Sequence, residues 1–117
     1  MTEITTPDTS NIILVLFNLK PKRSIADYEN WAKTTDLPIV RNLQSVDRFD
    51  VFRCTGLLGL NEAAPYAYAE ILEINDMEVF NQDVSTELMQ SVANQFQTFA
   101  DSPLFITTKA IDAITEV

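Results

Sequence analysis

The residues best suited to chemistry in this sequence are carboxylates and tyrosines, because the 117-residue chain contains no histidine. A chain without histidine lacks the usual general base, the Ser-His and Cys-His nucleophilic pairs and the commonest metal ligand. Residues 65–70, Pro-Tyr-Ala-Tyr-Ala-Glu, place two tyrosines and a glutamate at alternate positions. Alternate residues of a β-strand point to the same face. We therefore expect Tyr66, Tyr68 and Glu70 to share one face of a sheet.

An arginine on a second strand is expected to face this cluster. Residues 46–56 and 66–74 are predicted to form the two strands of a hairpin, and pairing them about its centre places Arg53 opposite Glu70. We expect this face to be turned into the cavity of a barrel, because polar groups in apolar surroundings are the usual makeup of a small-molecule site. The alternative is a cross-strand ion pair that satisfies itself.

The opposite face of this hairpin is expected to pack against helices. It carries Cys54 together with the small residues Ala67 and Ala69, which suit close packing. Cys54 is therefore predicted to be a structural, unreactive residue.

Glu70 is the predicted catalytic acid or base, since burial raises a carboxyl pKa toward neutrality while a nearby Arg53 lowers it. Asp36, in an expected loop before Pro38, is the second catalytic candidate, and the alternative is a turn residue. The tyrosines could donate hydrogen bonds to a developing oxyanion. The other substrate-binding residues predicted from position are Asn18, at the end of the first strand, and Trp31, whose alternative role is core packing.

The elements that must position these residues follow the order β-α-β-β-α-β, a ferredoxin-like α+β fold with a four-stranded antiparallel sheet and helices on one face. Ser24 is the predicted N-cap of a helix that runs through Trp31 or beyond, with a break near residues 36–37 ahead of Pro38. The other predicted elements are strands at 11–19, 46–56, 66–74 and 103–108 and helices at 77–82 and 87–100.

The strand at residues 11–19 is apolar on both faces. Two helices can cover only one face of a four-stranded sheet, and large exposed apolar faces are rare in monomers. We therefore expect a homodimer in which the second copy packs sheet against sheet, forming a dimeric α+β barrel. The alternative is a partly exposed sheet used for binding.

Composition mainly excludes classes of function. Seventeen acidic against eight basic side chains give a net charge of −9, which argues against nucleic-acid binding. We find no apolar run long enough to span a membrane, no metal-binding spacing and no cofactor motif, so we expect neither metal nor cofactor. The lone cysteine fits the cytoplasm. We expect a polar, flexible leader at residues 1–10, one domain at 11–110 and a tail at 111–117.

Two segments of the chain are distinctive: Thr-Thr-Asp-Leu-Pro at 34–38 and Pro-Tyr-Ala-Tyr-Ala-Glu at 65–70. Over about residues 11–108 the chain resembles the RedY-like HapK family, and these two segments are the most specific parts of the likeness. The resemblance implies a dimeric ferredoxin-like α+β barrel encoded with prodiginine (prodigiosin-type) and related pyrrole or indole pigment pathways. It implies no agreed reaction. The polar positions that match are Asn18, Thr34, Thr35, Asp36, Arg53, Tyr66, Tyr68 and Glu70.

Three classes of function follow from these expectations. The first is a cofactor-free enzyme of secondary metabolism that uses Glu70 and Asp36 for acid/base chemistry on a flat aromatic or pyrrolic intermediate, with a cofactor-independent monooxygenase as a variant. The second is a non-catalytic carrier or chaperone of a reactive intermediate. The third is a structural dimer whose cavity is fully packed.

Overall fold

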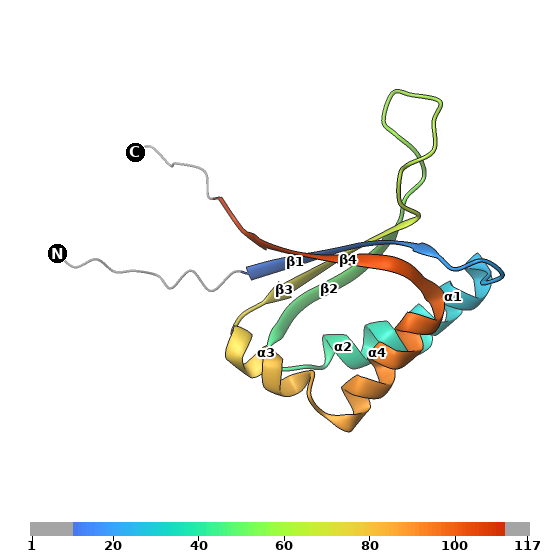
Figure 1. Cartoon of the computed structure of the whole chain (residues 1–117). Helices are drawn as coiled ribbons and strands as arrows, with labels where there is room; N and C mark the ends of the chain where they lie inside the picture. The colour runs from blue at the N-terminus through green and yellow to red at the C-terminus, as the bar shows by residue number, and fades with distance from the viewer. Residues whose placement is uncertain (1–10, 112–117) are drawn as a thin grey trace, which may run out of the picture.

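The computed structural model describes residues 11–111 of the chain. It is an antiparallel sheet in the strand order β2-β3-β1-β4, with the helices on one face (Figure 1). The expected leader at 1–10 and the expected tail from residue 112 onward lie outside the described residues. The elements are β1 (Asn11–Leu19), α1 (Ile25–Trp31), the π-helical turn η1 (Ala32–Asp36), α2 (Leu37–Arg41), β2 (Val46–Arg53), β3 (Tyr68–Ile74), α3 (Met77–Asp83), α4 (Glu87–Phe99) and β4 (Ala100–Lys109).

The element order confirms the predicted ferredoxin-like α+β fold. The segment α1-η1-α2 forms the first helical connection and the segment α3-α4 forms the second. β1 lies inside the sheet, hydrogen-bonded to β3 on one side and to β4 on the other.

An aromatic cluster forms the core between the sheet and the helices. Phe17 on β1 is fully buried, and its ring centroid lies 5.5 Å from that of Tyr28, 5.4 Å from that of Tyr68 and 4.9 Å from that of Phe96. These partners come from α1, β3 and α4. The cluster therefore holds both helical connections onto the same part of the sheet.

The first helical connection does not break where the sequence predicted. Ser24 caps α1 as expected, accepting a hydrogen bond from the Asp27 N–H at 3.0 Å, but the chain stays helical to Arg41. In place of a break, η1 widens the helix by one residue, and the Leu37 N–H donates to the Ala32 carbonyl five residues earlier. The prediction of a loop before Pro38 was wrong, because a π-turn accommodates an extra residue inside a continuous helix.

The hairpin register differs from the prediction by two residues. Arg53 pairs with Tyr68, and Glu70 pairs with Val51. A shift of two residues keeps every side chain on its predicted face, so Tyr68 and Glu70 still share a face.

The prediction of which face carries the helices was wrong. Val51, Tyr68 and Glu70 point toward the helices, and Tyr68 and Glu70 are buried there. Cys54 and Ala69 alternate with these residues and belong to the open face. The expected packing of Cys54 against helices is therefore also wrong.

The open face of the sheet carries several exposed apolar side chains. Phe52 is 44 % exposed, Leu104 44 % and Ile106 39 %. The long loop between β2 and β3 rises from the sheet on the side away from the helices (Figure 1). Leu58 in this loop is fully exposed. An apolar sheet face and an apolar loop thus lie on the same side of the molecule.

Candidate functional site

A cavity of about 300 Å³ lies between the sheet and the helices. Its exposed lining residues all belong to α4 and β4, so the cavity opens between these two elements. Phe105, which is 59 % exposed, stands at this mouth. The remaining lining is apolar apart from two carboxyl groups. The full set is Ile13, Val15, Asp36, Val40, Phe49, Glu70, Leu72, Phe80, Val84, Met89, Val92, Ala93, Phe96, Gln97, Phe105 and Thr107.

The two carboxyl groups in the cavity are those of Asp36 and Glu70, the two residues predicted from the sequence as catalytic candidates. Each residue is only 5 % exposed. Burial raises the pKa of Asp36 to about 7. Burial and the nearby Asp36 charge raise the pKa of Glu70 to about 8, against a smaller lowering by its hydrogen bond from Tyr28. At neutral pH the pair therefore holds at least one proton and can exchange it.

The Asp36 side chain makes no hydrogen bond or ion pair with any residue between 11 and 111. No fully buried side-chain oxygen among residues 11–111 lacks a partner, so the Asp36 oxygens keep some accessible surface. A carboxyl group held in apolar surroundings without a protein partner is costly in a purely structural role. Because Asp36 lines the cavity, its oxygens are available to a ligand. This is the single strongest sign that the cavity is a site.

Tyr28 on α1 supports the other carboxyl. Its hydroxyl donates to Glu70 Oε2 at 3.4 Å, and its ring is fully buried in the aromatic cluster. Burial and then the Glu70 and Asp36 charges raise the pKa of Tyr28 far above its usual value. The phenol therefore stays protonated and acts only as a donor, which favours the ionised form of Glu70.

We expect Tyr28→Phe to raise the pKa of Glu70 further above about 8, because the variant removes the one hydrogen bond that favours its carboxylate. The measurement is a carboxyl ¹³C NMR titration of the wild type and the variant. Tyr66→Phe is the matched control and should leave the Glu70 titration unchanged. A lower Glu70 pKa in Tyr28→Phe would contradict this role.

The π-turn and the strand alternation explain how the two carboxyls meet. Glu70 lies on β3 between Tyr68 and Leu72, both of which are buried on the same face. Asp36 is the last residue of η1, directly before α2. The widened turn therefore sets the direction in which Asp36 points, and π-turns of this kind occur often at functional sites.

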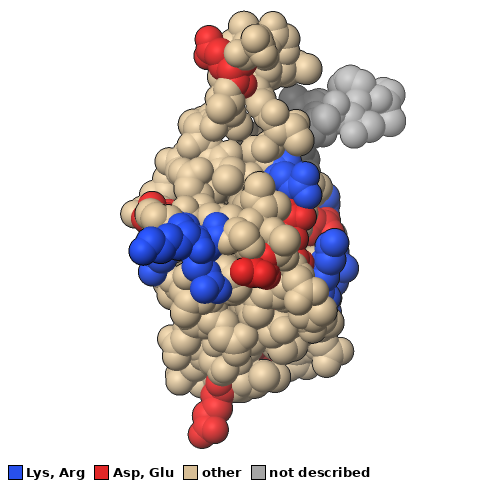
Figure 2. Space-filling model, turned by 90° about the vertical axis from the view of Figure 1, so that its right-hand side faces the viewer, with Lys and Arg blue, Asp and Glu red and all other residues tan. Residues whose placement is uncertain are grey.

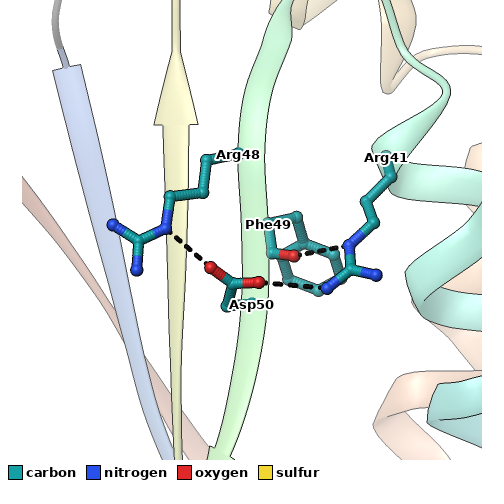
Figure 3. A network of polar contacts seen from close by, with 4 residues as sticks. All are labelled: Arg41, Arg48, Phe49 and Asp50. Carbon is teal, nitrogen blue, oxygen red and sulfur yellow. Dashed lines mark hydrogen bonds and ion pairs between the residues drawn. The ribbon is translucent and has the colours of Figure 1, made fainter.

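An ionic network fastens α2 to the edge strand beside the cavity (Figure 3). The Arg41 guanidinium donates to the Phe49 carbonyl at 2.8 Å and to Asp50 Oδ1 at 3.0 Å, while Arg48 donates to Asp50 Oδ2 at 2.6 Å. Phe49 and Val40, one from each of the joined elements, both line the cavity. The network thus holds the wall of the cavity from its solvent side.

Arg53 does not contact Glu70, so the alternative of a cross-strand ion pair between them is wrong. Its guanidinium binds Glu29 on α1 through two hydrogen bonds of 2.6 and 2.7 Å. The Tyr68 hydroxyl donates to the same glutamate at 2.7 Å. These residues line a separate, smaller pocket of about 250 Å³ together with Lys33. The charged groups at the surface are of mixed sign, and Figure 2 shows a band of basic side chains with acidic ones between them.

The remaining predicted residues do not line the cavity. Asn18 lies at the base of the hairpin loop, where it accepts from the Ala67 N–H at 2.9 Å. The Trp31 indole donates to Gln95 at 2.6 Å and packs on the core aromatics, as its alternative reading proposed. The Thr35 hydroxyl lies 3.4 Å from that of Thr34, and Tyr66 precedes β3 without entering the cavity.

Sequence reasoning missed Tyr28, Glu29 and the contribution of α4 to the cavity. The periodic apolar residues of α4 predicted a packed helix face, and Met89, Val92 and Phe96 are indeed buried. The cavity is the volume left between these side chains and the sheet. A pattern of apolar residues predicts which side chains are buried, but it does not predict a space between them. The sequence did indicate a buried position for Tyr28, because its spacing from Trp31 places both residues on the apolar face of one helix.

The other hollows and side-chain groups among the described residues are weaker candidates for a functional site. A hollow of about 640 Å³ lies within the β2–β3 loop, but its lining, from Thr55 to Ala63, is exposed and holds a single carboxylate. No group of three or more potential ligands able to hold a metal occurs within residues 11–111. Within the same residues, no helix has the length and apolar character needed to cross a bilayer.

Comparisons with known proteins agree with this fold. The crystal structure of HapK from Hahella chejuensis is 25% identical, with a TM-score of 0.69 over 92% of this chain and 98% of that one. A hydroxynitrile lyase from Passiflora edulis is 11% identical, with a TM-score of 0.76 over 93% and 100%. A dimeric ferredoxin-like protein of unknown function from Thermobifida fusca is 10% identical, with a TM-score of 0.70 over 92% and 97%.

A search of curated sequences returned no match. The family model described as REDY-like protein HapK matches residues 11–111, which are nearly the whole chain and include both cavity carboxyls. The chain belongs to the HapK family of REDY-like proteins.

Proposed function

We propose that this protein is a cofactor-free enzyme that transfers protons on an apolar, aromatic small molecule, with Asp36 and Glu70 as its acid and base. The observation that carries the proposal is the buried, unpartnered Asp36 carboxyl beside Glu70 in an apolar cavity. Carboxyl pKa values of about 7 and about 8 suit general acid/base work near neutral pH. The Passiflora lyase is an enzyme with the same fold.

We further propose the biological setting that family membership suggests. The enzyme would act in secondary metabolism, on an intermediate of a prodiginine or related pyrrole or indole pathway. It would work in the cytoplasm, where the lone Cys54 stays reduced. It would form a homodimer through the open face of the sheet, because that face exposes apolar side chains and the Thermobifida neighbour is dimeric.

The proposed chemistry can be tested with nitrobenzisoxazole, a flat apolar probe. A carboxylate base removes its ring C–H proton, the electron pair forms a nitrile, and the N–O bond breaks to release a coloured phenolate. We expect the wild type to open this probe about 100-fold faster than Asp36→Asn/Glu70→Gln. The rate should rise with pH through about 7 to 8, as the pair ionises.

Glu78→Gln, which removes an exposed carboxyl from α3, is the matched control and should keep the wild-type rate. Binding of the probe to each variant, measured by equilibrium dialysis, separates a lost base from a lost cavity. If the double variant binds the probe and turns it over as fast as the wild type, the acid/base assignment is wrong. A wild type that binds without turnover would instead indicate a carrier.

A further inference from the structure

The charge composition of the cavity restricts what can bind in it. Its lining contains two carboxyl groups and no lysine or arginine. Arg53 and Lys33 line the separate outer pocket, where Arg53 is hydrogen-bonded to Glu29. Arg41, next to Val40 in the cavity wall, donates to the Phe49 carbonyl and to Asp50. No charged residue of β1, β2, α3, α4 or β4 lines the cavity. Beyond the pair itself, the titratable group that faces it is Tyr28, a neutral donor.

We propose that the cavity selects ligands in which an apolar ring system carries an ammonium or similar cationic group, and that binding such a ligand displaces a proton from the Asp36–Glu70 pair to solvent. The proposal deepens the proposed function, since it names the ligand class of the same cavity. Asp36, which has no hydrogen-bonding partner among the described residues, supplies the oxygens that would receive the cation.

The reason for the displacement is that two neighbouring carboxylates repel each other in apolar surroundings. Burial and the repulsion between the two carboxylates retain a proton on the pair while no cation is bound. A bound cation replaces that proton as the compensating positive charge, and it makes charge-assisted hydrogen bonds that a neutral ring cannot make. Binding and proton release are therefore linked.

The same electrostatics exclude anionic ligands. A ligand carboxylate could enter only if both protein carboxyls were protonated, and even then no basic group would stabilise its charge. A neutral ring of equal size gains the apolar contacts alone. Affinity should therefore fall in the order cation, neutral, anion.

The test uses three naphthalenes of similar size: naphthylethylamine, its neutral isostere propylnaphthalene and the anion naphthylpropanoate. Naphthalene fluorescence gives each affinity at about pH 7.5. Calorimetry in phosphate and in Tris, which differ in ionisation enthalpy, counts the protons released. We expect the amine to bind about 10-fold or more tightly than the neutral isostere, with release of about half to one proton. Propylnaphthalene should release almost none.

Asp36→Asn/Glu70→Gln should lose the preference for the amine while still binding propylnaphthalene, which also shows that the variant cavity is intact. Equal or tighter binding of the neutral or anionic probe to the wild type, or amine binding without proton release, would overturn the proposal. The proposed function would fail separately. If charge selection fails while turnover of nitrobenzisoxazole still requires both carboxyls, the proton-transfer function stands. If the double variant keeps turnover and loses only the amine preference, the cavity is a cation-binding site without the proposed catalysis.

Discussion

We expect the free energy of unfolding of the wild type to fall as the pH rises from about 5 to about 9. The free energy of unfolding of the Asp36→Asn/Glu70→Gln variant should fall much less over the same range. In the unfolded chain both carboxyls ionise near pH 4. In the folded protein they retain protons up to about pH 7 and about pH 8. Between these limits the folded state binds more protons than the unfolded state, so raising the pH destabilises it.

The size of this effect follows from the raised pKa values. Each unit by which the folded pKa exceeds the unfolded one corresponds to roughly 1.4 kcal/mol. The two carboxyls are each raised by roughly 3 units, so ionising both lowers the free energy of unfolding by up to roughly 9 kcal/mol by pH 9. Glu29, whose pKa the Arg53 and Tyr68 hydrogen bonds lower to about 2, acts in the opposite direction. Its stabilising contribution is lost only as the pH falls below about 4, outside this window.

Urea unfolding at a series of fixed pH values measures this prediction. At pH 8 to 9 the double variant should be more stable than the wild type, because it does not carry the two buried carboxylate charges. Glu78→Gln is the control, because its exposed carboxyl should leave the wild-type slope intact. Parallel pH slopes for the wild type and the double variant would show that the pair is not buried in solution.

Replacing Phe17 by alanine should cost about 3 to 5 kcal/mol of unfolding free energy, the usual range for a fully buried aromatic residue. Phe17 touches the rings of Tyr28, Tyr68 and Phe96, so its loss loosens the cluster that holds α1 and α4 on the sheet. The measurement is urea or thermal unfolding at pH 6. The fluorescence of Trp31, which packs on Phe96 and Phe99, reports the same transition.

Leu58→Ala is the comparison for Phe17→Ala, because it also removes a large apolar side chain. Leu58 is fully exposed in the β2–β3 loop, and we expect a change within about 0.5 kcal/mol. A cost below about 1 kcal/mol for Phe17→Ala would mean that the aromatic cluster is not the core of the protein.

Most of the architecture was predictable because its strands and its capped helices have local signals. β-Branched and aromatic residues mark β1, and the side chains of Ser24, Asp76 and Thr86 cap α1, α3 and α4. The strand boundaries were less accurate. β4 begins at Ala100, directly after α4, rather than at Pro103, since no turn residue separates the two.

The two carboxyl groups of the candidate site could be identified from the sequence, but the face of the sheet that carries Glu70 could not be assigned to the helices. Alternation correctly grouped Tyr68 with Glu70, and the absence of histidine directed attention to Asp36. Alternation cannot say which of two apolar faces carries the helices. Ala67 and Ala69 misled the assignment, because small residues suit close packing against either a helix or a second sheet. In the observed register Arg53 lies opposite Tyr68, and Glu70 lies two residues farther along the strand beneath the helices. Arg53 therefore binds Glu29 on α1 instead of Glu70.

The π-turn has a consequence for how such a cavity can be gained or lost. Deleting one residue from Ala32–Asp36 would restore an ordinary helix and rotate the two flanking segments against each other by about 100°. Such a deletion would carry Asp36 away from Glu70 if α1 kept its packing. Loss of a single codon would thus abolish the carboxyl pair while leaving the strands and their pairing unaltered. Among natural sequences, a single-codon gap at this turn would therefore mark chains that keep the fold and have lost the carboxyl pair.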